Sequence, residues 1–331
     1  MRFNRLVRLG SGLALFLALG ATSASAQDGG SCDSWLPDFN CDRSGRWDGF
    51  HHPIVSFPLF EDPFITTGIY PYYAWHEFPG RSALQGGDAH DVSVQARIAL
   101  TDRLAFIATK DGYMWKNPDN PLLDDTEGFL NIAGGFKYAL VQDQEAGYIV
   151  TGVLRVEVDT GSSDTFQGWG DGMVLPSITG AWGSGPLHIM ADVGAQIPFD
   201  GNDQSTSIFY HLYADYNVTE HFAPFVQLSG LTWVSSGNGE IPVKLKRGIV
   251  PGSELTLDVA QSALGTGAFE GADLMNLGSR GVNGLSLWTW AVGAHIPITD
   301  HVTFSFAYER PFSHHKGIFG QRVTTGLTLE F

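Results

Sequence analysis

The chain lacks any long apolar run that could cross a membrane as a helix. Beyond the N-terminal region, its 331 residues contain no stretch of about eighteen consecutive apolar residues. Positive charge is also scarce, since 19 Lys and Arg residues oppose 35 Asp and Glu residues and the formal net charge is −16. This acidity argues against binding to nucleic acid or to anionic membrane surfaces. The sequence therefore predicts no transmembrane helix and no nucleic-acid partner.

Residues 1–26 have the pattern of a secretory signal peptide. Arginines precede a short apolar core at 13–19, and small residues occupy 24–26 before the predicted cleavage point. The apolar core is too short to span a bilayer, and no cysteine at the cleavage point could carry a lipid anchor. We therefore expect an exported protein whose mature chain begins at Gln27.

Beyond residue 62, apolar and polar residues alternate in segments of about ten to twelve residues, the length of a tilted strand that crosses a bilayer. In one segment, Leu187, Ile189 and Ala191 alternate with His188 and Asp192. Strands in soluble sandwiches are usually shorter. The composition, with 41 Gly, 22 Phe, 10 Tyr and 9 Trp residues, suits such strands and their aromatic girdles. The same alternation recurs at 92–100, 130–140, 148–158 and 208–218.

Three short turns, at 100–104, 218–222 and 298–302, share one form: an apolar residue, Thr, an acid, a basic or imidazole residue, and an apolar residue. Outer-membrane barrels have short periplasmic turns and longer outer loops. Counted from these turns, all short connections fall on the side of both termini, and the long connections 160–171 and 236–283 fall opposite. The sequence therefore predicts an all-β, antiparallel up-and-down transmembrane barrel of about 12 strands in the Gram-negative outer membrane, with periplasmic termini. The expected strands lie near 63–77, 89–100, 103–115, 128–140, 147–159, 172–183, 186–198, 205–218, 221–235, 284–298, 301–312 and 318–331.

The last strand has one apolar face, which includes Val323, Leu327 and the terminal Phe331. A strand that ends in Phe resembles the closing strand of bacterial outer-membrane barrels, where this residue belongs to the signal read by the barrel-assembly machinery. We expect that machinery as a partner, together with outer-membrane lipid and lipopolysaccharide, and we expect the strand to pair with 63–77, because an open edge is costly in lipid.

The polar phase of the strands is expected to line the lumen, because charges that face hydrocarbon are costly. It includes three histidines, His188, His211 and His295. These charges have two interpretations: a polar channel that selects a solute, or a salt-bridge network that fills and stabilises a narrow barrel. The charged candidates for lumen-lining residues are Arg97, Lys137, Arg155, Glu157, Asp192, Asp215, Glu309 and Arg322.

Two segments lack periodicity. Residues 27–62 are expected to form a periplasmic segment or a plug in the lumen. They contain the chain's two cysteines, Cys32 and Cys41, for which an oxidising compartment predicts a disulfide rather than a metal or redox pair. Residues 236–283 form a loop long enough to be functional, either constricting the pore or shielding the rim.

The sequence offers little for catalysis. Ser313, His314 and His315 lie together in the last outer loop, but they match neither the Gly-x-Ser-x-Gly motif nor the Ser-His-Asn arrangement of outer-membrane phospholipases. His51 and His52 are predicted at the opposite end of the barrel from His314 and His315, so the two pairs cannot share a metal. We predict no catalytic residues, no metal and no cofactor, and a membrane-embedded lipid hydrolase is the least favoured function.

The Thr-Asp-Arg-Leu type of turn, the Gly-rich strands and the terminal Phe resemble the family of outer-membrane barrels associated with the meta-pathway of phenol degradation (MetA-type), over roughly 90–331. The resemblance implies a transporter. The segment before the barrel is also similar to the lumen-filling hatch of long-chain fatty-acid channels, although those have fourteen strands. We therefore expect a channel or transporter for a small solute, with hydrophobic or aromatic compounds as candidates. The alternative is a plugged barrel with a structural or surface-interaction role.

Overall fold

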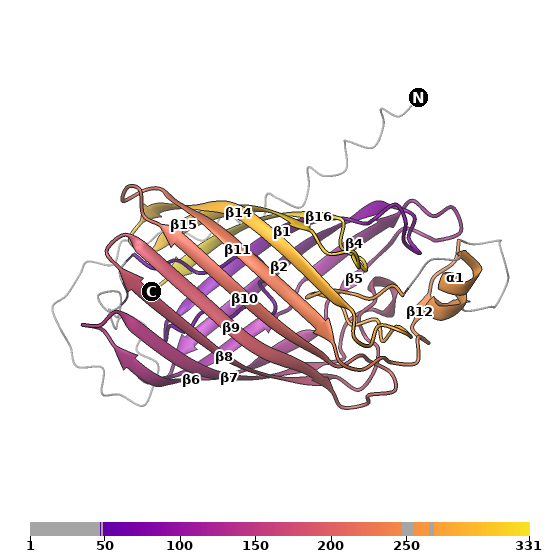
Figure 1. Ribbon diagram of the computed structural model, residues 1–331, viewed down its shortest axis with the longest axis horizontal. Helices are drawn as coiled ribbons and strands as arrows, with labels where there is room; N and C mark the ends of the chain where they lie inside the picture. Colours follow the sequence, from indigo (N-terminus) through magenta and orange to yellow (C-terminus); the bar gives the residue numbers. More distant parts are fainter. Residues whose placement is uncertain (1–46, 48, 247–254, 265–267) are drawn as a thin grey trace, which may run out of the picture. The chain divides into compact units, whose positions relative to one another are not determined.

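The computed structural model describes residues 47, 49–246, 255–264 and 268–331 (Figure 1). The predicted signal peptide and the predicted Cys32–Cys41 disulfide lie outside the described residues. The described part contains one α-helix, α1 (Leu257–Leu264), and none of its helices is long and apolar enough to cross a membrane.

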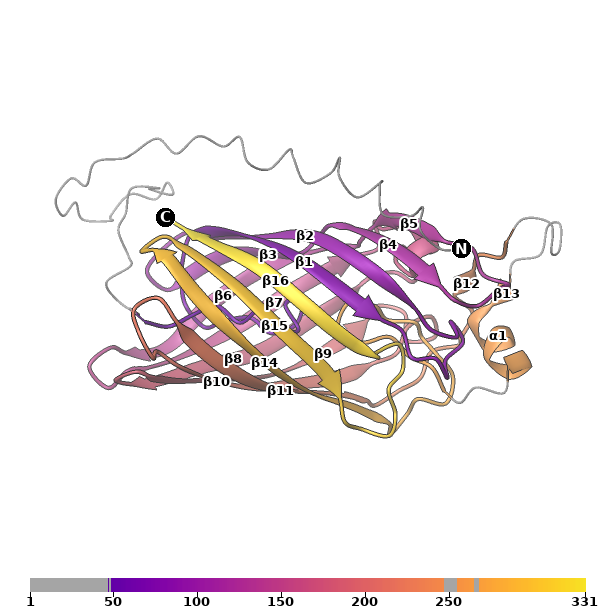
Figure 2. The ribbon, with the colours of Figure 1, turned by 90° about the horizontal axis from the view of Figure 1, so that it is seen from above.

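The strands form one antiparallel sheet that closes on itself, because β1 pairs with both β2 and β16 (Figure 2). Its 14 strands make twelve passes, since β3 and β4 are consecutive parts of one pass and β5 and β6 of the next. The predicted barrel of about 12 strands is confirmed, and so is the pairing of the last strand with the first. The strands are β1 (Gly68–Glu77), β2 (Gly87–Ala99), β3 (Leu104–Lys110), β4 (Tyr113–Pro118), β5 (Thr126–Phe129), β6 (Ile132–Asp143), β7 (Tyr148–Val158), β8 (Met173–Ser184), β9 (Leu187–Pro198), β10 (Ser207–Tyr216), β11 (Ala223–Trp233), β14 (Ser286–Thr299), β15 (Val302–Pro311) and β16 (Gln321–Glu330).

The break between β3 and β4 was not predicted. Gly112 has φ = 140°, a conformation that favours glycine, and an added Cβ there would lie 2.6 Å from the carbonyl oxygen of Val92. Asp111 uses its carboxylate to accept a hydrogen bond from the backbone N–H of Val94. The third pass is therefore interrupted at the point where the N–H of Val94 on β2 bonds to the carboxylate of Asp111 instead of to a backbone carbonyl.

Side chains alternate between an apolar outer face and a buried inner face. On β10, Ile208 and Leu212 are exposed, whereas Phe209, His211 and Tyr213 are buried. An exposed apolar band of this kind is the lipid-facing surface of a transmembrane barrel. The inner face is less uniformly polar than the sequence suggested, because large aromatic side chains share it with the charged ones.

The tight turns lie at one end of the barrel, here called the turn end, where Figure 1 also places the C-terminus. The backbone N–H of Leu100 bonds to the carbonyl of Leu104, and Val218 bonds to Phe222 in the same way. The opposite end, the loop end, carries the long connections. The longest includes β12 (Pro242–Val243), β13 (Leu255–Thr256) and α1.

Candidate functional site in the barrel lumen

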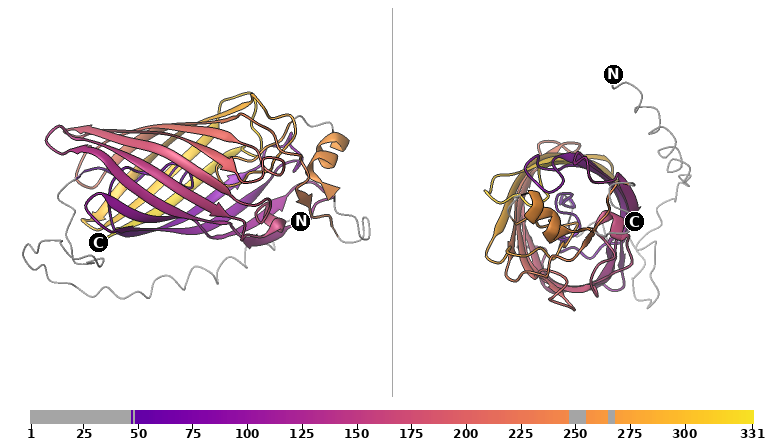
Figure 3. Two further views of the ribbon diagram at one scale, coloured as in Figure 1. Left: turned by 90° about the horizontal axis from the view of Figure 1, so that it is seen from below. Right: turned by 90° about the vertical axis from the view of Figure 1, so that its right-hand side faces the viewer.

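The lumen holds a segment that precedes the first strand. We call residues 50–66 the N-terminal plug. Seen along the barrel, this indigo segment lies inside the ring of strands (Figure 3). Ile54, Val55, Phe57 and Phe60 are buried with at most 1% of their surface exposed. The first pass, expected at 63–77, instead begins at Gly68, because the residues before it belong to the plug.

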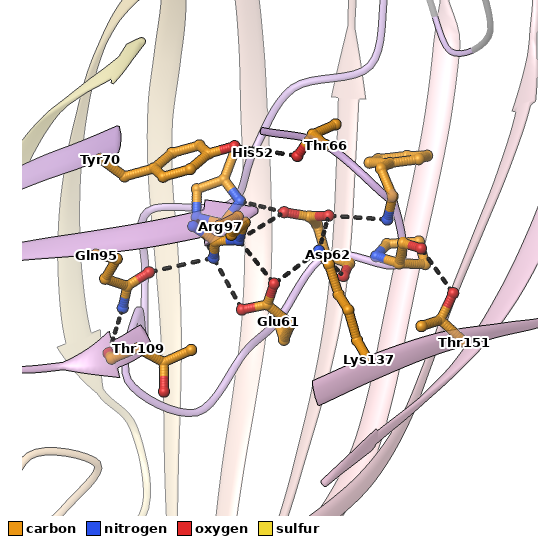
Figure 4. A network of polar contacts seen from close by, with 12 residues as sticks. His52, Glu61, Asp62, Thr66, Tyr70, Gln95, Arg97, Thr109, Lys137 and Thr151 are labelled. Carbon is orange, nitrogen blue, oxygen red and sulfur yellow. Dashed lines mark hydrogen bonds and ion pairs between the residues drawn. The ribbon is translucent and has the colours of Figure 1, made fainter. Parts of the chain in front are cut away.

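An ion network fixes the plug to the wall (Figure 4). Arg97 on β2 donates from Nε and Nη2 to the two carboxylate oxygens of Glu61, over 2.7 and 2.8 Å. Lys137 on β6 donates to Oε1 of Glu61 over 2.8 Å and to Oδ1 of Asp62 over 2.9 Å. The ring of His52 bonds to the other oxygen of Asp62 over 2.6 Å. The network therefore matches two wall cations with two plug carboxylates, away from solvent.

Glu61 lies outside the spanning strands, and its surroundings favour the ionised form. Burial alone would raise the pKa of Glu61, but the charges of Arg97 and Lys137 outweigh this effect and hold that pKa at about 2. The carboxylate is therefore charged at neutral pH, and each ion of the network depends on the others to offset its desolvation.

The wall also holds the plug by its backbone. Arg155 on β7 donates from Nη1 to the carbonyl of Pro58 over 2.7 Å and from Nη2 to that of Leu59 over 2.9 Å. The plug has no regular partner strand, so side chains of the wall satisfy carbonyl groups that a sheet would otherwise pair. Three uncharged wall side chains act similarly: Gln95, Thr151 and Gln227 donate to the carbonyls of Phe57, Pro63 and Val55.

A second segment enters the lumen from the loop end. We call residues 268–279 the loop plug. Asp273 accepts two hydrogen bonds from Arg322 on β16, of 2.9 and 2.7 Å, and Arg322 also donates to Glu309 on β15. Gln167 donates to the carbonyl of Leu274 over 3.0 Å. Part of the long loop 236–283 therefore lies against the inner face of the wall, where Asp273 forms an ion pair with Arg322.

The loop plug is organised around a buried carboxylate of its own. Glu270 accepts hydrogen bonds from the backbone N–H groups of Gly271, Leu277 and Ser279, and from the hydroxyl of Ser205. The side chain of Glu270 thus binds backbone groups up to nine residues further along the chain. The segment is therefore folded largely through its own contacts.

Two wide cavities lie at the ends of the barrel, one inside the lumen at the turn end and one among the loops at the rim of the loop end. The turn-end cavity has a volume of about 880 Å³ and the loop-end cavity about 740 Å³. Near the meeting of the two plugs, around Ser56 and Asp273, the described residues enclose a cavity of only about 20 Å³, roughly the space of one water molecule. The two plugs therefore leave little open space where they meet.

The two cavities differ in charge. Among the described residues, the lining of the turn-end cavity includes the carboxylates of Asp102, Glu220, Asp300 and Glu330, together with Asp62 of the plug, and no Lys or Arg. The lining of the loop-end cavity includes Arg81, Arg310 and Lys316, with Glu77 as its one carboxylate. Among the described residues, the turn-end opening of the lumen is therefore acidic, and the rim of the loop end carries several cations.

All eight charged candidates for lumen-lining residues are buried in the structure, but they do not form one group. Arg97, Lys137 and Arg155 contact the N-terminal plug, and Arg322 joins Glu309 to the loop plug. The others make pairs within the wall: Glu157 with Lys110, Asp192 with His211, and Asp215 with His188. His295, in turn, bonds to Tyr213 and Ser305.

Sequence reasoning missed Glu61, Asp62, Glu270 and Asp273, because they lie in segments without periodicity. The charged residues predicted to face inward include as many cations as carboxylates. Because these charges balance, the sequence did not indicate that further carboxylates would pair with the cations. Only folding of these segments into the lumen reveals their role.

The loop residues considered for catalysis are engaged otherwise. The hydroxyl of Ser313 donates to the carbonyl of His315 over 2.6 Å and accepts from the backbone N–H of Trp288. The ring of His315 packs edge-on against Trp233. Among the residues that the structure describes, no His, Cys, Asp and Glu side chains form a group of three that could hold a metal ion.

Comparisons with known proteins bear on the fold. No family model and no curated protein matches the chain. An outer-membrane channel from Pseudomonas putida F1 is similar in structure over 82% of this chain and 97% of that one, with 13% identity and a TM-score of 0.50. The fold is that of an outer-membrane β-barrel. No comparison shows membership of the meta-pathway family, and that resemblance stays a prediction.

Two other barrels are similar at lower TM-scores. The KdgM porin in complex with oligogalacturonate covers 79% of this chain and 99% of its own, with 9% identity and a TM-score of 0.40. The outer-membrane phospholipase A of Escherichia coli covers 81% of this chain and 97% of its own, with 10% identity and a TM-score of 0.35. These two likenesses add nothing to the assignment of the fold.

Proposed function

We propose that this outer-membrane β-barrel is a gated channel for small solutes, described here in its closed form. The N-terminal plug and the loop plug are the gates. The observation that carries the proposal is the source of the ion pairs: Arg97 and Lys137 on the wall pair with carboxylates of the plug. In a barrel that is only a filled scaffold, the cations of the wall could pair with carboxylates of the wall. A separate segment would not be needed to supply their partners.

The arrangement supports one orientation. Short turns mark the periplasmic end of outer-membrane barrels, so we place the turn end, the C-terminus and the N-terminal plug on the periplasmic side. A solute then enters from the loop end and reaches the loop plug first. Lipid and lipopolysaccharide surround the wall, and the strand ending at Phe331 is the segment that the assembly machinery would recognise.

A plugged structural barrel is the second candidate. Wall-to-wall pairs favour it, since His188 with Asp215 and His211 with Asp192 are bonded between β9 and β10 and need no plug. Lys110 with Glu157 and Arg322 with Glu309 are further pairs within the wall, on other strands. They are compatible with either function, whereas the plug contacts of Arg97 and Lys137 favour a removable segment.

Planar-bilayer conductance tests the proposal. We expect low conductance from the full mature chain and clearly higher conductance from Glu61→Gln/Asp62→Asn, which removes both plug charges while keeping side-chain size. The matched control, Asp119→Asn/Glu145→Gln, removes two charges from exposed positions and should conduct like the parent. Folded but non-conducting Glu61→Gln/Asp62→Asn protein would overturn the channel and favour the structural barrel.

A further inference from the structure

Three cations of the wall lie close together behind the N-terminal plug. Arg97 pairs in register with Ile107, Ile107 with Gly135, and Gly135 with Arg155, so the two arginines occupy one row across four strands. Lys137 is two residues from Gly135 and therefore points to the same side. We call Arg97, Lys137 and Arg155 the basic row. Each of them has at most 1% of its surface exposed.

Two residues of the basic row, Arg97 and Lys137, bind carboxylates. Arg97 grips both oxygens of Glu61, and Lys137 reaches one of the same oxygens over 2.8 Å. The two-point contact of a guanidinium with a carboxylate is geometrically specific and strong. Lys137 also binds the neighbouring carboxylate of Asp62, so the row accommodates two carboxylates at once. The contacts of Glu61 and Asp62 thus show the geometry in which the row binds carboxylates.

The row has donors that the plug does not use. Nη1 of Arg97 and Nε of Arg155 are buried and make no hydrogen bond to any described residue. Buried donors normally find acceptors. The wall itself offers few acceptors, since Gln95 is the wall residue that accepts from Arg97. When the plug leaves, three cations therefore lose their acceptors together, which is costly unless another anion replaces them.

The loop end adds an independent observation. Its cavity is lined by Arg81, Arg310 and Lys316 against a single carboxylate, Glu77. A concave opening of one charge sign raises the local concentration of ions of the other sign. An anion that approaches this end therefore meets positive charge at the rim before it reaches the loop plug.

We propose that the basic row is the binding site of the channel for small organic anions that carry carboxylates, and that Glu61 and Asp62 compete with them for it. The proposal rests on the proposed function, because the row becomes accessible only when the plug moves. The N-terminal plug then acts as a built-in substitute for the solute. Its two carboxylates offset two of the three positive charges of the row while the channel is closed, and a bound dicarboxylate offsets two of them while the channel is open.

Calorimetric titration of the detergent-solubilised mature protein with succinate tests this site without requiring conduction. We expect Glu61→Gln/Asp62→Asn to bind succinate at least about tenfold more tightly than the parent, because its plug no longer competes, and to ignore uncharged succinamide. Adding Arg97→Gln should weaken succinate binding about tenfold, the effect of one lost charge-assisted contact. Arg155→Gln in the same background gives a second test if the Arg97 variant does not fold.

Lys116→Met provides the matched control in that background. Lys116 is a buried cation whose Nζ lies over the ring of Phe166, outside the basic row, so its loss should leave succinate affinity unchanged. Absent succinate binding, equal binding of succinamide, or affinity unaffected by the Arg97 and Arg155 changes would overturn the anion site. If succinate binds but no variant conducts, the channel function is overturned and the anion site is retained. Conductance without succinate binding would sink the site alone.

Discussion

The two plugs fill the same lumen in different ways. The N-terminal plug contains no strand and is held mainly by the wall, through Arg97, Lys137 and Arg155 on three strands. The loop plug is folded around its own Glu270 and has one ion pair with the wall, from Asp273 to Arg322.

The difference shows which segment depends on the wall for its shape. Within the N-terminal plug, His52 bonds to Asp62, and the backbone N–H groups of Leu59 and Phe60 bond to the carbonyl of Ser56, but no single group binds residues along the segment as Glu270 does. We therefore expect the N-terminal plug to lose most of its conformation when it leaves. The loop plug should leave as a folded unit once its ion pair with Arg322 and its hydrogen bonds to Gln167 and Ser205 break. Substitutions at the wall should therefore affect the two plugs to different extents.

The largest effect is expected from Lys137→Met. It leaves Glu61 and Asp62 with one fewer cation in a buried network, and breaking such a network costs about 3–5 kcal/mol. Hydrogen exchange followed by mass spectrometry should show strongly reduced protection of residues 54–65 and little change in 269–277. Conductance should rise in parallel.

Lys110→Met is the matched control for this prediction. Lys110 is also a buried cation, but it pairs with Glu157 within the wall. Its loss should lower the stability of the barrel and leave the relative protection of the plug unchanged. If both variants expose residues 54–65 equally, the wall contacts of Lys137 have no special role in docking the plug.

A smaller effect is expected from Asp273→Asn. Arg322 keeps Glu309 as its partner, so the loss is the charge-assisted contact alone, about 1.5–3 kcal/mol. Protection should fall for the loop plug as a unit and stay high for the N-terminal plug. Glu309→Gln removes the wall partner of the same arginine, and it should leave the loop plug docked. Equal exposure by both changes would show that Asp273 does not hold the segment.

The barrel was predictable because its information is local. Alternation gave the strands, the repeated turns gave their direction, and the polar phase correctly placed residues such as Arg97 and Arg322 inside. The break in the third pass was missed, although Asp111 and Gly112 form a typical turn signal. The strand is interrupted there because Gly112 adopts a backbone conformation that favours glycine. The alternation of apolar and polar residues gives no information about backbone conformation.

The two plugs were not predictable, because their contacts are not local in the sequence. Prolines recur through the N-terminal plug, and its backbone bonds end on wall side chains rather than on another strand. No sequence period can encode such contacts. The partner of Arg97 is 36 residues away in the chain, and the partner of Arg322 is 49 residues away. Only the folded lumen brings them together.

The smallest expected effect is a difference between the two plugs in how acid weakens their docking. Against the effect of burial, Arg97 and Lys137 hold the pKa of Glu61 at about 2, below its ordinary value of 4.5, and Lys137 and His52 also hold that of Asp62 low. Ionised Glu61 therefore stabilises docking above pH 4.5, and this contribution is lost as the pH falls toward about 2. Burial instead raises the pKa of Glu270, so its protonation does not weaken the loop plug in the same way.

In the loop plug the two carboxylates act in opposite directions, because Arg322 outweighs burial and lowers the pKa of Asp273. In the N-terminal plug both carboxylates shift downward. Between pH 4.5 and 2, the protection factors of residues 54–65, corrected for intrinsic exchange, should therefore fall more steeply than those of 269–277, by at most about tenfold per pH unit for each carboxylate. Parallel curves for the two segments would mean that the plugs leave the lumen together, and that the separate attachments of Glu61 and Asp273 do not make them independent gates.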